Sequence, residues 1–264
     1  MRKSFLKTGL MVAAAGLLLA SAAVAQKVSF KDPVNDDNGP GNYTYPTDTV
    51  YKRGSFDMTG FDVQAKGNKA DFDVTFNSPL EDPWGMKTGF SVQMVFIFID
   101  NKEGGFTEGV PGTNVTFAAG NEWDHLVILS PQAPGTVKNE VQAKMPAATQ
   151  TAVHVPDRTK GAGRTISGSV DLAALGGGDP SQWGYQVVVQ SNEGFPDKTD
   201  LLTRKVNEYE GQHRFGGGTD SDCDPHAIDV LAADVAAQHA MLKYECNPDG
   251  TAKQAAVLKM VRKQ

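Results

Sequence analysis

Several acidic residues near the start of the chain have the types and spacing of a metal site. Asp32, Asp36 and Asp37 share one short turn, and carboxylates so close together repel one another unless a cation lies between them. Calcium takes roughly six to eight oxygen ligands, which a tight turn rich in carboxylates supplies. We therefore predict a structural calcium site at these residues, with Asp57 of the neighbouring predicted strand as a further ligand. The alternative is that they cap turns in a solvated loop.

Aromatic side chains offer a second kind of chemistry, the stacking of sugar rings on flat apolar faces. Ligand sites combine such apolar walls with a few placed polar groups. Trp84 lies in a predicted turn, and Tyr43 and Tyr45 alternate so that both would share one face of an extended segment. We therefore predict that these side chains bind a carbohydrate. Trp123 and Trp183 each begin a predicted strand, which favours packing in or beside the core.

Residue patterns that would indicate catalysis do not occur in the sequence. It contains no G-x-S-x-G, H-E-x-x-H or C-x-x-C-H motif. The five histidines are spread along the chain without ligand spacing: His125, His154, His213, His226 and His239. Acidic residues are plentiful, but sequence alone does not place two of them across a glycosidic bond. We predict that the protein is not an enzyme.

The first 25 residues have the pattern of a secretory signal peptide. Basic residues precede an apolar stretch at residues 10–20, and a run of small residues ends in a cleavage site after Ala25. A membrane anchor fits less well, because the apolar stretch is shorter than the ~20 residues that span a bilayer. We predict a secreted protein without a membrane span, located in the periplasm, at the cell surface or outside the cell.

The chain has two cysteines, Cys223 and Cys246. An exported protein folds in an oxidising compartment, where an even pair of cysteines tends to close. We therefore predict a disulfide between them, which would tether the C-terminal segment. The alternative is a pair of buried free thiols.

The charge of the chain argues against a nucleic-acid partner. Asp and Glu number 31 against 25 Lys and Arg, a formal net charge of −6, and some of the basic residues belong to the predicted signal peptide. Binding to a phosphate backbone depends on the release of counterions by Lys and Arg. An acidic protein gains little from it, so we expect no nucleic-acid partner.

Short runs of alternating apolar and polar residues, separated by turn-forming residues, indicate an antiparallel β-sandwich. Residues 71–76 alternate strictly, which predicts one buried face. Residues 92–99 are almost continuously apolar, which predicts a central strand covered on both faces. The predicted strands are residues 56–63, 70–76, 90–99, 124–129, 152–155, 165–170, 185–190 and 227–231.

Helix is expected at one main place, residues 235–244, where Asp234 has the position of an N-cap. A short helical turn is expected at residues 172–175. No linker or internal repeat divides the sequence, so we expect one domain over residues 26–264. The predicted fold is all-β, an antiparallel, jelly-roll-like β-sandwich with a short C-terminal helix.

Motifs in a fixed order run through most of the chain. The block D-P-x-x-D-D-x-G-P-G-x-Y-x-Y-P-T begins at Asp32. On this block and the segments that follow it, the sequence resembles the C-terminal, SLH-like binding module of glucodextranases, also found in some amylopullulanases. The further matching segments are residues 55–61, 89–91, 99–100, 111–115, 123–124, 178–185, 214–218 and 228–231.

The resemblance implies a β-sandwich related to family nine carbohydrate-binding modules and to DOMON-like domains, attached to a cell envelope or a polysaccharide. It implies no active site, because the hydrolytic residues of those glucosidases lie in a separate domain. We therefore predict a secreted, non-catalytic module that binds a carbohydrate or a cell surface and is stabilised by calcium. Its partner would be a polysaccharide or a cell-wall glycan.

Two other functions fit the same sequence. The first is a structural protein of the cell envelope that binds proteins and no sugar. The second follows from the resemblance to DOMON-like domains, which can hold haem b between their sheets. Met94 and His125 are the residues that could ligate such a haem, although a core methionine and a histidine at a strand end explain them more simply.

Overall fold

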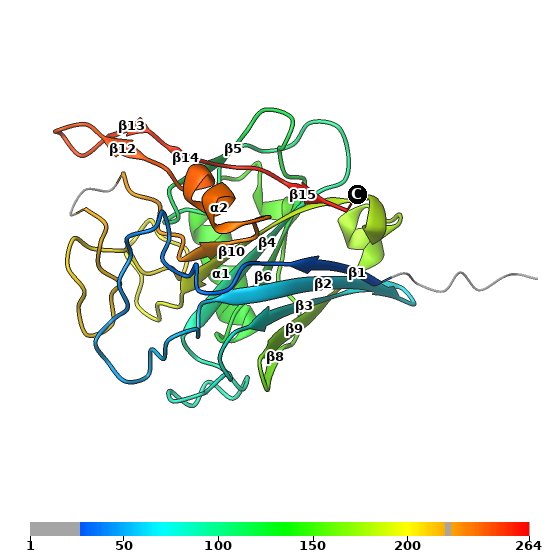
Figure 1. Ribbon diagram of the computed structural model, residues 1–264. Helices are drawn as coiled ribbons and strands as arrows, with labels where there is room; N and C mark the ends of the chain where they lie inside the picture. Colours follow the sequence, from blue (N-terminus) through cyan, green and yellow to red (C-terminus); the bar gives the residue numbers. More distant parts are fainter. Residues whose placement is uncertain (1–26, 220–222, 264) are drawn as a thin grey trace, which may run out of the picture.

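Two β-sheets stacked face to face form the body of the molecule (Figure 1). The structure, a computed structural model, describes residues 27–219 and 223–263. The predicted signal peptide, residues 1–25, lies outside the described residues.

The first sheet has five strands, and every neighbouring pair in it is antiparallel. Its order is β1-β2-β3-β9-β8. The strands are β1 (Lys27–Lys31), β2 (Met58–Lys66), β3 (Lys69–Phe76), β8 (Thr159–Ala162) and β9 (Thr165–Asp171).

The second sheet has the order β11-β10-β4-β6-β7, and β15 also pairs with β10. Its pairs are antiparallel except for β6 with β7. The strands are β4 (Gln93–Asp100), β6 (His125–Leu129), β7 (Val153–His154), β10 (Gly184–Ser191), β11 (Asp229–Val230) and β15 (Val261–Arg262).

The alternation in β3 places its apolar side chains between the sheets and its acidic ones on the outer face. Phe72 and Val74 are fully buried. On the outer face, Asp73 accepts a hydrogen bond of 2.6 Å from the hydroxyl of Ser167, and Asp71 accepts one from Ser169. The predicted one-sided strand is therefore confirmed, and serines on β9 satisfy its polar face.

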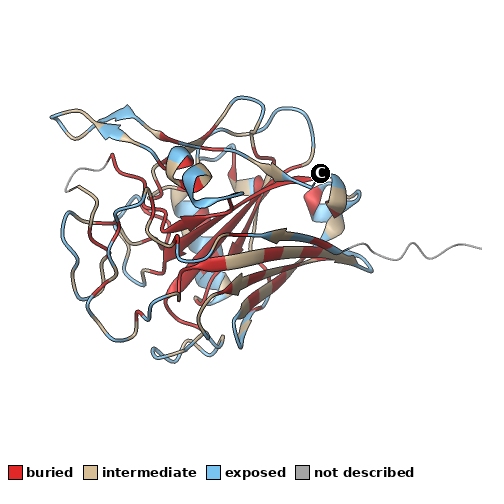
Figure 2. Cartoon of the chain, viewed as in Figure 1, coloured by how far each residue is buried: buried red, intermediate tan, exposed pale blue. Residues whose placement is uncertain are grey.

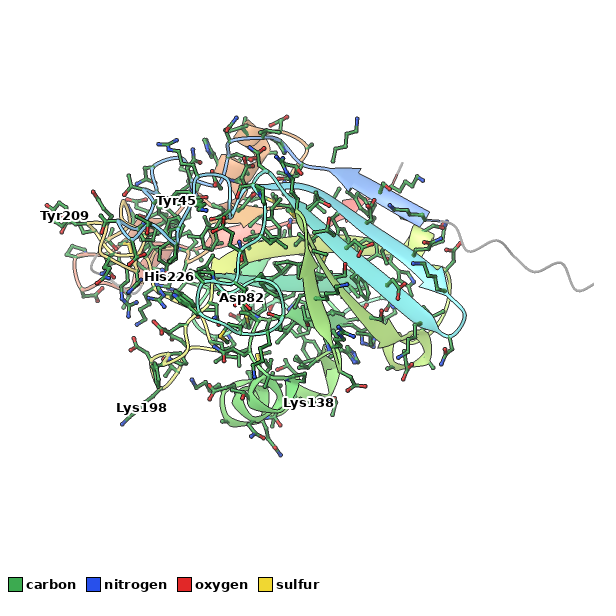
Figure 3. The ribbon with its side chains drawn as sticks, turned by 90° about the horizontal axis from the view of Figure 1, so that it is seen from below. Tyr45, Asp82, Lys138, Lys198, Tyr209 and His226 are labelled. Carbon is green, nitrogen blue, oxygen red and sulfur yellow. A yellow bond between two sulfur atoms is a disulfide. The ribbon has the colours of Figure 1, made fainter. Side chains whose placement is uncertain are left out.

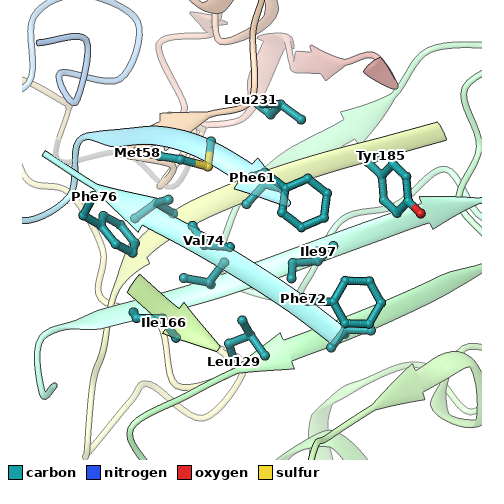
Figure 4. Packing of buried hydrophobic residues seen from close by; sticks show 14 of the residues in the cluster. Met58, Phe61, Phe72, Val74, Phe76, Ile97, Leu129, Ile166, Tyr185 and Leu231 are labelled. Atoms are coloured by element: carbon teal, nitrogen blue, oxygen red, sulfur yellow. The ribbon is translucent and has the colours of Figure 1, made fainter. Parts of the chain in front are cut away.

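The main core fills the space between the two sheets (Figure 4). Phe61 and Phe72 of the first sheet stack at 6.4 Å between ring centroids, and Tyr185 of the second sheet lies edge-on to Phe61. Ile97 and Leu129 add aliphatic side chains from the middle of the second sheet. Every one of these residues is at most 1% exposed.

A second apolar core lies on the other face of the second sheet, so β4 is buried along its whole length (Figure 2). Phe96 and Phe98 of β4 point into this core. The elements that cover it are α1 (Pro134–Lys144), α2 (Val235–Met241), and the parallel pair β5 (Val115–Phe117) and β14 (Ala256–Leu258). The prediction of a central strand covered on both faces is confirmed.

The eight predicted strands all occur, with boundaries shifted by a few residues. The predicted C-terminal helix occurs as α2; the carboxylate of Asp234 accepts a hydrogen bond of 2.8 Å from the backbone N–H of Ala237, as an N-cap does. The short turn expected at residues 172–175 is the 3₁₀ helix η2, Leu172–Leu175.

Several elements were not predicted, the longest of which is α1. It begins with a proline and buries only Val137 and Val141, so it has little of the apolar periodicity that identifies a helix. The other unpredicted elements are the strands β1, β5, β8, β14 and β15, the 3₁₀ helices η1 (Gln150–Ala152) and η3 (Pro180–Gln182), and the hairpin β12 (Glu245–Cys246) and β13 (Ala252–Gln254). No helix in residues 27–219 or 223–263 has both the length and the apolar character that crossing a membrane requires.

Cys223 and Cys246 form a disulfide, with 5.8 Å between their Cα atoms. It links the loop that precedes β11 to strand β12. The exposed hairpin of β12 and β13 (Figure 2) is thereby held to the body of the molecule.

Reduction of this disulfide should destabilise the protein. A closed loop of 23 residues corresponds to about 3 kcal/mol of chain entropy in the unfolded state, or roughly 5–10 °C in melting temperature for a chain of this size. We expect that loss on addition of a reductant in scanning calorimetry. The double variant C223S/C246S is the control, and its melting temperature should not respond to the reductant.

Candidate functional site

Three buried carboxylates converge where the first sheet meets the second. Asp32, Asp36 and Asp229 each have a carboxylate oxygen within 4.8 Å of one on the other two. Asp36 and Asp229 are completely buried, and Asp32 is 7% exposed. Asp57, also completely buried, interacts electrostatically with all three. We call these four residues the aspartate cluster.

The ends of strands position the cluster. Asp32 directly follows β1, and Asp57 directly precedes β2. Asp229 is the first residue of β11, at the edge of the second sheet. Its carboxylate accepts a hydrogen bond of 2.7 Å from the backbone N–H of Met58, so it joins the two sheets.

Backbone N–H groups satisfy only part of the hydrogen-bonding capacity of these carboxylates. Asp32 accepts a bond of 2.8 Å from the N–H of Ala232, and Asp57 accepts bonds from the N–H of Asn35 and the side-chain amide of Asn77. Among the described residues, both oxygens of Asp36 and one each of Asp32, Asp57 and Asp229 have no hydrogen-bond partner. Buried polar atoms are rarely left without a partner, so the cluster has the character of an ion site.

Electrostatics in the cluster oppose ionisation without a cation. Burial, followed by the repulsion of Asp36 and Asp57, raises the pKa of Asp32 to about 9. Burial and the charge of Asp57 raise the pKa of Asp36 to about 6. Burial also raises the pKa of Asp229 well above its usual range, with Asp32 the next cause. No lysine or arginine of the described chain forms a salt bridge with any of the four.

Gln238 of α2 fixes the loop that carries Asp36. Its side-chain amide donates to the backbone carbonyls of Asp36 and Gly39, and its side-chain oxygen accepts from the N–H of Val230. Gln238 is completely buried. The C-terminal helix therefore supports the loop that carries Asp36 and the strand that carries Asp229.

The cluster differs from the predicted ligand set at two positions. Asp37 lies outside the group of closest carboxylates and accepts a hydrogen bond from the hydroxyl of Tyr45, although it interacts electrostatically with Asp36 and Asp57. Asp229 joins Asp32, Asp36 and Asp57, although nearly 200 residues separate it from Asp32. The signal that could have identified it is a carboxylate inside the apolar segment of residues 227–232, since a buried charge needs a compensating partner.

Tyr43 and Tyr45 lie at a cleft of about 340 Å³ that Asp37 and Arg53 also line. Tyr43 is only 5% exposed, and its hydroxyl donates to the carbonyl of Pro225. Tyr45 packs edge-on against Phe56 in the core. Because these rings pack against protein, they do not form the exposed aromatic face that the alternation predicted.

Trp84 lies at a separate cleft of about 330 Å³. Its side chain is at the surface, with 37% exposure, and it contacts Tyr51 and His213 edge-on. Both clefts belong to the loop end of the sandwich, where Tyr45 and Asp82 are labelled in Figure 3. The three residues predicted to bind sugar therefore lie at two separate clefts: Tyr43 and Tyr45 at one, and Trp84 at the other.

A family model described as the C-terminal binding-module, SLH-like, of glucodextranase matches residues 28–261. The chain belongs to this family. The match covers both sheets and the outer layer as far as β15, so the C-terminal segment that carries the disulfide is part of the glucodextranase-type module. A comparison with curated proteins found no match.

The two residues considered as haem ligands are far apart in this module. His125 lies opposite Ile99 in the pairing of β6 with β4, and Met94 lies five residues further along β4, roughly 17 Å away at the rise of a strand. His125 instead contacts His154, with 3.1 Å between Nδ1 of the first and Nε2 of the second. Met94 and His125 are therefore too far apart to serve as the two axial ligands of one haem.

The histidine pair should contribute a loss of stability in acid. Burial, and then the proximity of His125, lowers the pKa of His154 to about 4, against 6.5 in an unfolded chain. Below pH 6.5 the unfolded state therefore binds a proton that the folded state resists, and stability present at neutral pH is lost as the pH falls toward 4. We expect this group to contribute a loss on the order of 1–2 kcal/mol between pH 7 and pH 5. The raised pKa values of Asp32, Asp36 and Asp229 act in the opposite direction, because the folded state binds their protons more tightly than the unfolded state does.

Denaturant titrations of the natural chain and of the variant H154N at several pH values measure this contribution as the difference between the two proteins. H154N carries an uncharged polar side chain, so its stability relative to the natural chain should rise by on the order of 1–2 kcal/mol as the pH falls from 7 to 5. Equal slopes for the two proteins would assign the acid sensitivity to other groups.

Proposed function

We propose that this chain is a secreted, non-catalytic module that binds a glycan at a cell surface or on a polysaccharide, and that a structural calcium ion stabilises it. The observation that carries the proposal is the match of a binding-module family to residues 28–261, nearly the whole described chain. The predicted signal peptide and the disulfide between Cys223 and Cys246 favour an oxidising location outside the cytoplasm.

The arrangement of carboxylates supports binding rather than glycoside hydrolysis. Glycoside hydrolases place two carboxyl groups about 5–9.5 Å apart on either side of an accessible sugar. The carboxylates that the fold gathers here, those of Asp32, Asp36 and Asp229, have oxygens within 4.8 Å of one another. They are also buried, which leaves no room for a sugar between them.

The glycan proposal predicts binding without turnover. On an array containing dextran, pullulan, starch and peptidoglycan fragments, the purified protein should bind at least one glycan saturably. Incubation with the same α-glucans should release no reducing sugar. Binding to none of them would favour the alternative of a structural envelope protein, and release of reducing sugar would contradict the non-catalytic assignment.

The aspartate cluster supports the calcium part of the proposal. Four buried carboxylates supply up to eight oxygens, within the roughly six to eight that calcium takes. Five of these oxygens have no hydrogen-bond partner among the described residues: one of Asp32, both of Asp36, one of Asp57 and one of Asp229. A divalent cation would offset the repulsion that raises their pKa values. Its role would be structural, since it would join β1, β2 and β11.

Calcium removal should lower the melting temperature. A ligand that binds only the folded state at a hundredfold excess over its Kd contributes about 2.7 kcal/mol, or roughly 5–10 °C here. We expect that difference between protein in excess calcium and protein in a chelator, measured by differential scanning fluorimetry. An unchanged melt would count against the site.

Two neighbouring substitutions provide a matched test of which carboxylates bind. Asp36→Asn removes a charge from the cluster, so it should abolish most of the calcium-dependent shift and raise the melting temperature in chelator, because less repulsion remains. Asp37→Asn removes the same charge one residue away, at the hydrogen bond to Tyr45. It should leave the calcium-dependent shift intact; loss of the shift in both variants would contradict the assignment to the cluster.

A further inference from the structure

The cleft beside Trp84 combines exposed aromatic surface with polar groups held in place. Phe195, on the loop after β10, is 95% exposed, the largest exposure of any bulky apolar residue in the described chain. It lines the same cleft as Trp84, together with Gln132, Glu193, Arg204 and His213. Exposed apolar side chains gathered at one cleft are typical of binding sites.

The backbone beneath Trp84 is fixed by Asp82, which lies at the loop end of the molecule (Figure 3). The carboxylate of Asp82 accepts hydrogen bonds of 2.7 and 2.8 Å from the N–H groups of Met86 and Lys87. It also accepts one from the hydroxyl of Ser91, the residue whose oxygen accepts from the N–H of Trp84. The backbone that carries the indole is thus fixed before a ligand arrives, which reduces the entropic cost of binding.

The buried side-chain amide of Asn192 supports the polar side of the cleft. Asn192 is 1% exposed and accepts a hydrogen bond of 3.2 Å from the side chain of Gln132. Arg204 donates to the backbone carbonyl of Asn192 and pairs with Glu193 at 3.4 Å. The Nε of Arg204 and the Nδ1 of His213 are buried and have no hydrogen-bond partner among the described residues.

These features fit an uncharged sugar unit. The apolar faces of a pyranose stack on aromatic rings, and its vicinal hydroxyls hydrogen-bond to guanidinium, carboxylate and amide groups. The ionised side chains that line the cleft, Arg204 and Glu193, compensate each other, so the wall favours neither an anion nor a cation. A volume of about 330 Å³ lies at the lower end of the range of small-molecule sites, which suits a chain end or a short segment.

We propose that this cleft is the glycan-binding site, in which Trp84 and Phe195 stack against a neutral sugar unit while Glu193 and Arg204 bind its hydroxyls. The inference rests on the proposed glycan-binding function and locates it away from Tyr43 and Tyr45. The cleft takes its residues from the loops that follow β3 and β10, together with Gln132, just before α1.

Retention on immobilised dextran, pullulan, starch and peptidoglycan fragments tests the site. W84A and F195A should each weaken binding to the retaining glycan at least tenfold. F195A is the safer variant for folding, because its side chain packs on little. The matched control is Y209A, which removes an aromatic side chain that is 73% exposed and does not line the cleft; it should bind as the natural chain does.

Fluorescence gives a direct reading of the same site. The chain has three tryptophans, and Trp123 and Trp183 are 0% and 5% exposed. Acrylamide quenching therefore reports mainly on Trp84, and the retaining glycan in soluble form should protect it. Because the lining charges cancel, salt between about 0.05 and 1 M should leave retention nearly unchanged.

The outcomes separate the two proposals. If the natural chain is retained and both W84A and F195A bind equally well, the cleft is not the site, and the glycan-binding function stands. A strong decrease in retention with salt would overturn the neutral-sugar assignment. If none of the four glycans retains the natural chain, the proposed function fails, and the cleft assignment fails with it.

Discussion

Burial of the second sheet on both faces is the constraint on which the rest of the molecule depends. The central strand β4 presents Ile97 to the core between the sheets and Phe98 to the outer core, so a cover is needed on each side. The first sheet supplies one cover as a regular antiparallel layer. The other is assembled from short segments far apart in sequence: α1, α2, β5 and β14.

Sequence patterns predicted those strands whose burial is visible in their own residues. The strict alternation around Phe72 and the continuous apolar run around Ile97 each reflect a fixed environment on one or both faces, so both strands could be identified. Helix α1 was missed because it contributes only Val137 and Val141 to the core. Short strands such as β5 and β14 were missed because pairing with distant partners defines them more than their own composition does.

The candidate sites likewise combine residues that the sequence identified with residues that only the fold brings together. The acidic turn of Asp32 and Asp36 is local and could be identified, as could Asp57 on the next strand. Asp229 and Gln238 could not, because only the packing of β11 and α2 brings them to that turn. Tyr43 looked available for stacking, but Gly39 adopts a positive φ of 60° and lets the tyrosine ring lie against the backbone. Exposure is a property of the assembled loops, which explains why Phe195 was not recognised beside Trp84.

The parallel pairing of β5 with β14 has a consequence for how the chain acquires its structure. Residues 115–117 pair with residues 256–258, so the outer core cannot close before residue 258 has been synthesised. The first sheet needs only residues 27–171, so its strands can pair while the outer core is still open. Phe96 and Phe98, on the outer face of β4, therefore lack part of their apolar cover during this interval.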